Sequence, residues 1–251
     1  MIAGQSHSAI PIVALDVADA ESALRLARSL GDDCRFFKVG SELFTAAGPD
    51  VVRALRGELG ADVFLDLKFH DIPNTVAGAV RSAATLGVRL LTVHTSGGRA
   101  MLEAARLAAG EVAGDECGVL GVTVLTSMDA PGLGAAWGRP VASVRDEVLR
   151  LSDDAAAAGL HGIVCSGEEA AEVSRRHGNR LALLVPGIRL AGGAAHDQRR
   201  VVTPEAAVAA GARYLILGRA VTEAPEPREA MRRVWSALGP GGHFASGSRD
   251  G

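Results

Sequence analysis

Lysine is nearly absent from this chain of 251 residues. Only Lys38 and Lys68 are lysines among the 26 Lys+Arg positions, so every other basic position is arginine. Arginine can replace lysine where only a solvated positive charge is needed, but a guanidinium does not readily release a proton. Two interpretations follow. Either a composition rich in Ala, Arg and Gly has suppressed lysine by chance, or the two lysines carry chemistry that arginine cannot.

Other features are missing as well. The three cysteines, Cys34, Cys117 and Cys165, lie far apart without a CxxC pair, which argues against a disulfide framework and against a zinc site. The formal net charge of -3 gives no basic excess to attract nucleic acid or an anionic membrane. No apolar run approaches the roughly 18 residues of a membrane span, and no basic stretch precedes an apolar one at the start. We expect a cytoplasmic protein with a small-molecule ligand and without nucleic-acid or membrane partners.

Eight short apolar runs predict eight β-strands. Most are leucine-rich or β-branched and apolar on both faces, which is typical of strands buried in a parallel sheet. The runs cover residues 9–15, 35–40, 62–68, 89–94, 118–125, 161–165, 181–186 and 213–218.

Amphipathic stretches separate these runs and predict helices, with examples at 20–30, 48–60, 100–110 and 203–212. Alternating strands and helices in this number favour an α/β fold, a single-domain (β/α)8 TIM barrel. An open doubly wound sheet is the alternative, but no GxGxxG follows the first run. We expect a mobile segment at 1–9, the barrel at 10–236 and a flexible Gly/Ser-rich tail at 237–251.

Charged residues gather near the end of the third predicted strand, in DVFLDLKFHDIPNT. Strand alternation places Asp66 and Lys68 on one face, Asp71 follows shortly after, and Lys38 lies near the end of the second run. An ordinary surface ion pair is one interpretation. The other is an active site, because barrel enzymes carry theirs at the C-terminal ends of the strands. Carboxylates beside Lys68 favour its ammonium form, so Lys68 is predicted to donate a proton rather than form a Schiff base.

Two loops after the last two runs resemble a phosphate grip. PGIR spans 186–189 and GRA spans 218–220, where barrels commonly bind phosphate through backbone amides and a helix N-terminus. Arg219 would add a bidentate cation, and the glycine-rich stretch 190–200 is a candidate lid that carries Gln198.

Several polar residues at strand ends remain open. Asp16 could accept sugar hydroxyls, and Thr126 and Ser127 could bond a polar base, but each could equally serve a turn or a cap. His70 and His94 could be bases or ligands, or could be histidines satisfied by hydrogen bonds at the barrel rim.

The stretch DLKFHDIPNT resembles the DxKxxDIPNT signature of the orotidine 5'-phosphate decarboxylases. The likeness continues in order over roughly residues 10 to 235, through VALD, FKVGSELF, VHTSGG, VTVLTS, VCSGEEA, PGIR, DQRRVVTPEAA and LGRAVT. Two small departures stand out: Thr95 follows the histidine where alanine is more usual, and the lid has little bulk.

The resemblance implies a homodimeric barrel that converts orotidine 5'-phosphate to UMP and carbon dioxide in pyrimidine biosynthesis without metal or organic cofactor. Lys38, Asp66, Lys68 and the Asp71 of the second subunit would form a charged network, with Lys68 as proton donor. Substrate contacts are implied for Asp16, Lys38, Ile72, Thr75, Thr126, Ser127, Pro186, Arg189, Gln198, Gly218 and Arg219, with Thr75 also reaching across the dimer interface.

Two rivals stay open. A sister group, the hexulose-phosphate synthases and keto-gulonate-phosphate decarboxylases, shares the DxKxxD strand but uses magnesium. Lys38 argues against it, because an ammonium would repel the metal where that group offers a carboxylate. The second rival is a barrel that binds UMP without catalysis.

Overall fold

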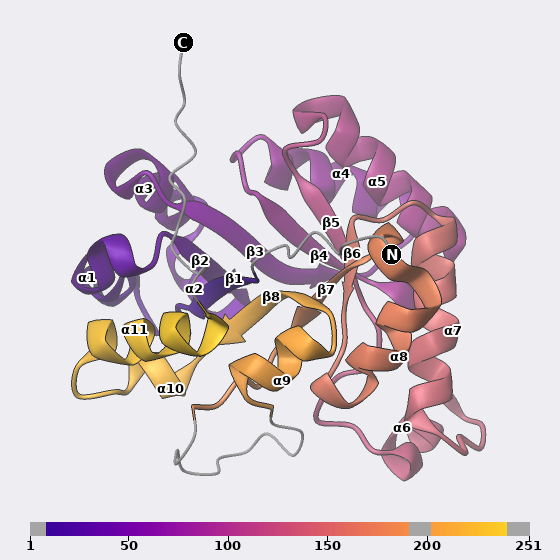
Figure 1. Cartoon of the computed structure of the whole chain (residues 1–251). Helices are drawn as coiled ribbons and strands as arrows, with labels where there is room; N and C mark the ends of the chain where they lie inside the picture. Colours follow the sequence, from indigo (N-terminus) through magenta and orange to yellow (C-terminus); the bar gives the residue numbers. More distant parts are fainter. Residues whose placement is uncertain (1–8, 191–201, 240–251) are drawn as a thin grey trace, which may run out of the picture.

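The computed structural model describes residues 9–190 and 202–239. Its strands form a closed parallel barrel in which each pairs with its neighbour in sequence and β8 pairs with β1 (Figure 1). The strands are β1 (Ile10–Ala14), β2 (Phe36–Gly40), β3 (Asp62–Phe69), β4 (Leu90–His94), β5 (Gly118–Val122), β6 (Gly162–Val164), β7 (Ala182–Val185) and β8 (Ala212–Leu217). The predicted (β/α)8 TIM barrel and its eight strands are confirmed.

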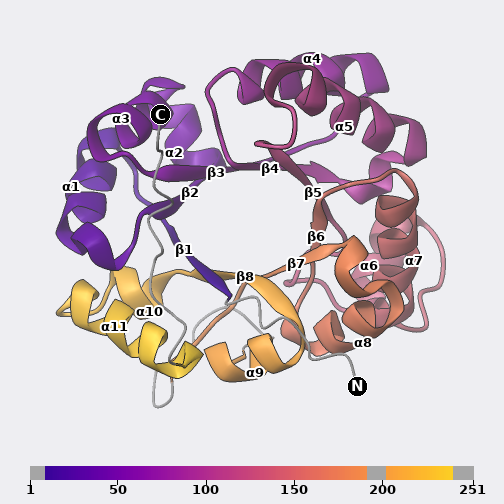
Figure 2. The same ribbon diagram turned by 45° about the horizontal axis from the view of Figure 1, so that its top comes forward.

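Helices surround the ring of strands on the outside (Figure 2). They are α1 (Ala20–Leu30), α2 (Ser41–Ala47), α3 (Asp50–Leu59), α4 (Pro73–Ala84), α5 (Arg99–Ala113), α6 (Ala130–Trp137), α7 (Val144–Ala157), α8 (Gly167–His177), α9 (Pro204–Ala209), α10 (Arg219–Thr222) and α11 (Pro227–Leu238). The predicted helix at 20–30 has the bounds of α1, because Asp19 caps it by accepting the backbone N–H of Ser22 at 2.7 Å and Gly31 follows its end.

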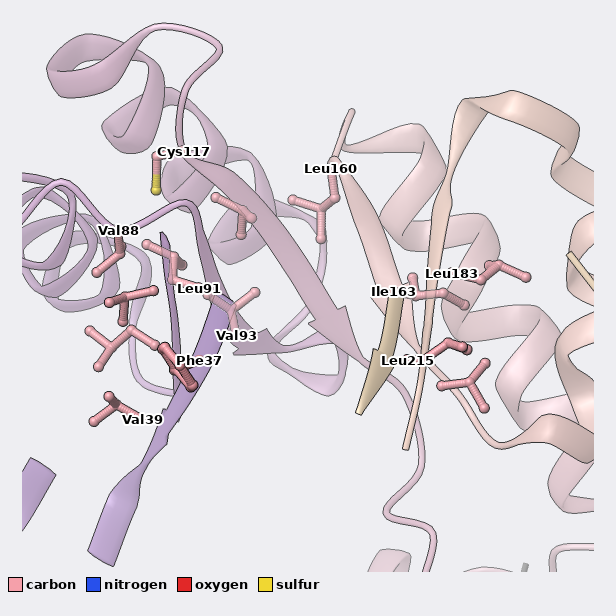
Figure 3. Packing of buried hydrophobic residues seen from close by; sticks show 14 of the residues in the cluster. Phe37, Val39, Val88, Leu91, Val93, Cys117, Leu160, Ile163, Leu183 and Leu215 are labelled. Carbon is pink, nitrogen blue, oxygen red and sulfur yellow. The ribbon is translucent and has the colours of Figure 1, made fainter. Parts of the chain in front are cut away.

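The core has two layers, as alternation along barrel strands requires. Side chains that point outward pack between strands and helices; Phe37, Val39, Leu91, Val93 and Leu215 are among them (Figure 3). Side chains that point inward fill the barrel and include Ile12, Phe36, Phe64, Leu90, Leu120 and Leu184. Burial on both sides explains why the strands read as continuous apolar runs rather than as alternating ones.

Three expected boundaries differ from the structure. Ala9 was assigned to the N-terminal segment, but it is 4% exposed and belongs to the core. Helix α11 continues through Leu238, beyond the boundary expected at residue 236. Strand β5 ends at Val122 rather than at residue 125; the backbone N–H of Thr123 makes the last bond to β6, at the Val164 carbonyl, and its hydroxyl donates to the same oxygen. No helix in the described part of the chain is long and apolar enough to cross a membrane.

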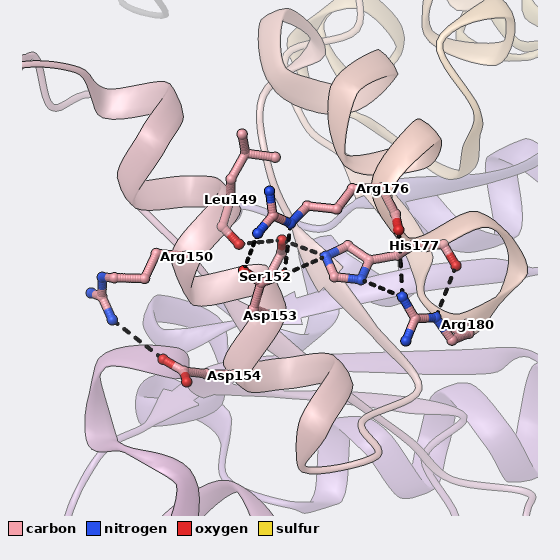
Figure 4. Close-up of polar contacts among 8 residues, drawn as sticks. All are labelled: Leu149, Arg150, Ser152, Asp153, Asp154, Arg176, His177 and Arg180. Atoms are coloured by element: carbon pink, nitrogen blue, oxygen red, sulfur yellow. Dashed lines mark hydrogen bonds and ion pairs between the residues drawn. The ribbon is translucent and has the colours of Figure 1, made fainter.

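A buried histidine joins helices α7 and α8 (Figure 4). His177 Nε2 lies 2.8 Å from Ser152 Oγ and 3.5 Å from Asp153 Oδ1, and its Nδ1 lies 3.4 Å from an Arg180 nitrogen. Arg176 holds Asp153 through two hydrogen bonds. Burial lowers the pKa of His177, and Arg180 and Arg176 lower it further, against the opposing effect of Asp153. The fold therefore favours the neutral imidazole.

Stability is expected to fall as the pH drops below about 6.5, the ordinary histidine pKa. The pKa values of His94, His161 and His177 are all lowered, chiefly by burial. The unfolded chain therefore takes up protons first as the pH falls, and unfolding becomes easier. Asp153 acts outside this window, since its pKa is also lowered and its contribution is lost only in stronger acid. Thermal melting at pH 7.5 and 5.5 should show the loss, and His177→Gln should reduce it; equal melting temperatures at the two pH values would contradict the prediction.

Candidate active site

A cavity of about 320 Å³ opens at the C-terminal ends of the strands. Its apolar floor includes Phe64, Leu184 and Ile216, which belong to the inner layer of the core. Most of the residues predicted to form the site also line it: Asp16, Lys38, Asp66, Lys68, Thr126, Pro186, Arg189, Gly218 and Arg219. The barrel thus brings together side chains that lie up to two hundred residues apart in sequence.

Lys38 enters this cavity from β2. The residue is only 9% exposed, and its Nζ donates to Asp16 Oδ1 at 2.7 Å, just beyond the end of β1. Gly40 leaves room for the ammonium, because a Cβ at that position would lie 3.0 Å from Lys38 Nζ. The first lysine is therefore a buried cation paired with a carboxylate that is itself open to solvent, and this arrangement suits contact with a polar ligand.

Asp66 and Lys68 form the second pair. Lys68 Nζ donates to Asp66 Oδ2 at 2.8 Å, and both side chains line the cavity. Alternation along β3 places both on the inner side with Phe64, while Leu65 and Leu67 pack in the outer layer. Lys68 has a φ of 53°, and the register between β3 and β4 shifts between Leu65 and Phe69. The predicted alternation therefore holds along β3, and a backbone distortion at Lys68 accompanies it.

Thr92 on β4, which the sequence did not single out, lies behind the cavity and contacts both residues of this pair. Its buried hydroxyl donates to Asp66 Oδ1 at 3.0 Å and accepts the backbone N–H of Lys68 at 2.9 Å. The available signal was a single hydroxyl inside an otherwise apolar strand, in LLTVH. Thr92 lies in the middle of β4, whereas the predicted site residues were sought at the ends of strands.

Three predicted residues of one segment lie outside the cavity. Asp71, Ile72 and Thr75 occupy the loop after β3 and the first turn of α4, and all three are exposed. Ile72 is 66% exposed, which is unusual for a large apolar side chain, and its backbone N–H binds Asp71 Oδ1 at 2.6 Å. None of them is in the lining of the cavity within this single chain.

The loops after β7 and β8 form the opposite wall. Pro186, Arg189, Gly218 and Arg219 line it, and Arg219 is the first residue of α10. The Nε atom of Arg189 is buried and has no hydrogen-bond partner among residues 9–190 and 202–239. A buried guanidinium N–H without a partner is costly, so this wall suits an anionic ligand. Gln198 lies outside the described residues.

The remaining polar candidates differ in their position relative to the cavity. Thr126 lines the cavity, whereas Ser127 is exposed and does not. His94 is half-buried, and its ring lies 5.4 Å from that of the exposed His70. Burial lowers the pKa of His94, with further lowering by the charges of His70 and Lys68. A neutral imidazole at the rim of the barrel is the result.

Fold and site together define a (β/α)8 barrel with a lysine–aspartate cavity whose lining also carries Arg189 and Arg219. The sequence profile of the orotidine 5'-phosphate decarboxylase / HUMPS family matches residues 10–234. This chain belongs to that family.

Known relatives agree over most of the chain. An orotidine 5'-phosphate decarboxylase of Chromobacterium violaceum is 48% identical over 233 residues, which are 92% of each chain. One from Laribacter hongkongensis is 50% identical over 232 residues, covering 90% of this chain and 92% of the relative. The crystal structure of orotidine 5'-phosphate decarboxylase from Lactobacillus acidophilus superposes with a TM-score of 0.81 at 33% identity and covers 92% of this chain and 99% of that one.

Proposed function

We propose that this chain decarboxylates orotidine 5'-phosphate to UMP and carbon dioxide in pyrimidine biosynthesis, acting in the cytoplasm. The observation that carries the proposal is the convergence of two ion pairs, Asp16–Lys38 and Asp66–Lys68, in one cavity whose far wall holds Arg189 and Arg219. Relatives named for this activity share almost half of its residues across the barrel.

Lys68 is the proposed proton donor. As the bond between carbon 6 of the pyrimidine and its carboxyl group breaks, the electron pair stays on carbon 6 and carbon dioxide leaves. The Lys68 ammonium then supplies the proton that completes UMP. Asp66 Oδ2 accepts a hydrogen bond from the ammonium at 2.8 Å and would sit beside the departing carboxylate. Fixed charges of this kind can stabilise a carbanion and repel a substrate carboxylate without reorganisation during the reaction.

The other cavity residues would hold the rest of the nucleotide. Asp16 and Lys38 suit the ribose hydroxyls, since one offers acceptors and the other donors in direct contact. Thr126 suits the edge of the pyrimidine, and the exposed position of Ser127 makes it the weaker candidate.

The opposite wall would hold the phosphate. Its proposed contacts are Pro186, Arg189, Gly218 and Arg219, with Gln198 as a further contact from the lid. Binding energy from this remote group can organise the charged residues at the reacting carbon, so a substrate that lacks phosphate should lose turnover as well as affinity.

A homodimer would complete the site. Asp71, Ile72 and Thr75 are exposed at the rim and are absent from their own chain's cavity, although the family resemblance gives them roles in the site. A second copy that receives this loop would account for both facts and would cover Ile72. In that arrangement Asp71 of each subunit joins the Lys38–Asp66–Lys68 network of the other.

Decarboxylation is expected to proceed with EDTA present. Lys38 and Lys68 place two ammonium groups among the cavity carboxylates, and such groups repel a divalent cation. Among the described residues, no three His, Cys, Asp or Glu side chains gather as metal ligands. The assay follows the loss of orotidine absorbance with and without chelator, and the two rates should agree within about twofold. Strict magnesium dependence would instead favour the hexulose-phosphate synthase branch of the family.

The same assay separates catalysis from simple binding. Tight UMP affinity without any change in orotidine absorbance would identify a nucleotide-binding barrel rather than an enzyme.

A further inference from the structure

The hydroxyl of Thr92 lies at the junction of the two halves of the Asp66–Lys68 pair. Thr92 is 0% exposed and belongs to the β-strand beside β3, so its position is fixed by the sheet. Its Oγ1 lies 3.0 Å from Asp66 Oδ1 and 2.9 Å from the backbone nitrogen of Lys68. One atom therefore contacts the side chain of one charged residue and the backbone of the other.

Hydrogen counting fixes the direction of both bonds. A backbone N–H can only donate, so the Thr92 oxygen must accept from Lys68. The hydroxyl has a single proton, and that proton is left for Asp66 Oδ1. Because Lys68 Nζ already donates to Oδ2, both oxygens of Asp66 accept a hydrogen bond in a defined direction. The Asp66 carboxylate is therefore fixed by one hydrogen bond at each oxygen, from Lys68 and from Thr92.

The second bond supports an uncommon backbone conformation. Lys68, with its φ of 53°, is the one non-glycine residue in the described part of the chain with positive φ. Such conformations are sparsely populated and persist where the surroundings hold them. The register shift beside Lys68 interrupts the regular ladder with β4, and the Thr92 hydroxyl takes the Lys68 N–H at this point. Thr92 thus supports the backbone conformation of Lys68, whose side chain lines the cavity.

We infer that Thr92 is a positioning residue for decarboxylation, acting through Asp66 and the backbone of Lys68. The inference rests on the proposed function, because it assigns Thr92 the task of holding the proposed proton donor and its carboxylate partner in register. A serine at this position keeps both hydrogen bonds, whereas valine keeps the shape and loses them.

The test compares Thr92→Val with Thr92→Ser in purified full-length protein. Loss of a hydrogen bond to a charged group should lower kcat for Thr92→Val by roughly 10- to 100-fold, while KM for orotidine 5'-phosphate stays within about threefold. Thr92→Ser should keep at least about a third of the wild-type kcat. Thr95→Val is the matched control, because Thr95 is equally buried on the adjoining turn but its hydroxyl donates only to the Val122 carbonyl.

Three outcomes would overturn the inference: a Thr92→Val kcat within about threefold of wild type, an equal loss in Thr95→Val, or no rescue by serine. If Thr92→Val does not fold, Thr92→Ala against Thr92→Ser gives the same comparison. An inactive wild-type protein would count against the proposed function, whereas an active wild type with an unaffected Thr92→Val counts against Thr92 alone.

Discussion

Replacing Lys68 with alanine should nearly abolish decarboxylation while UMP still binds. The change removes the proposed proton donor, and positioned general acids contribute about 10²- to 10⁴-fold to rate, so we expect kcat to fall at least about 10³-fold. UMP carries no departing carboxylate, and the contacts proposed for its phosphate and ribose are other residues of the cavity. Its dissociation constant should therefore change by less than about tenfold. Orotidine absorbance measures the first quantity and calorimetric titration the second.

Lys68→Arg is the matched control for this prediction. It retains a positive charge beside Asp66 but cannot readily release a proton, so it should be impaired nearly as severely as the alanine variant. A variant of either kind that keeps a tenth of the wild-type kcat would show that Lys68 is not the acid. If Lys68→Arg kept its kcat while Lys68→Ala lost it, the role of Lys68 would be electrostatic.

Mixing inactive Lys68→Ala and Asp71→Ala proteins should restore activity through hybrid dimers. In a hybrid dimer, one site combines Lys68 of the Asp71→Ala chain with Asp71 of the Lys68→Ala chain and is intact. The other site lacks both residues. Random exchange makes half of the dimers hybrid, so the expected recovery is about a quarter of wild-type activity. The exposed position of Asp71, outside its own chain's cavity, is the structural reason for the effect. Mass-distinct tags and native mass spectrometry verify the exchange.

A mixture of Lys68→Ala with Asp66→Ala is the negative control. Lys68 and Asp66 contact each other within one chain, so no hybrid site can contain both. Recovery in this control, or confirmed exchange without recovery in the first mixture, would show that Asp71 does not act across the interface.

The barrel was readable from the sequence because its strands are buried on both faces. Each leaves an apolar run, and the helix at 20–30 could be bounded to the residue since Asp19 and Gly31 mark its ends. The same apolar runs do not show where each strand ends. Strand β5 ends at Val122, inside an apolar run that continues to residue 125, so the run alone does not mark its end.

The sequence predicted those cavity residues whose type alone is unusual at their position. Lys38 and Lys68 stand out by rarity, and their partners Asp16 and Asp66 lie just after β1 and within β3. Thr92 did not stand out, because its importance comes from a register shift that no periodicity predicts. Thr126 and Ser127 are adjacent and chemically alike, so only the path of the loop separates the one that lines the cavity from the exposed one.

The placement of the two lysines has a consequence for covalent modification. Amine acylation targets lysine and leaves guanidinium groups unchanged, and the only side-chain amines of this chain are in the cavity. Every other position among the 26 Lys+Arg residues is arginine. A reagent or enzyme that acylates a lysine of this protein must therefore reach into the site, and a single acylated side chain is enough to neutralise one of the two cations on which the proposed chemistry depends.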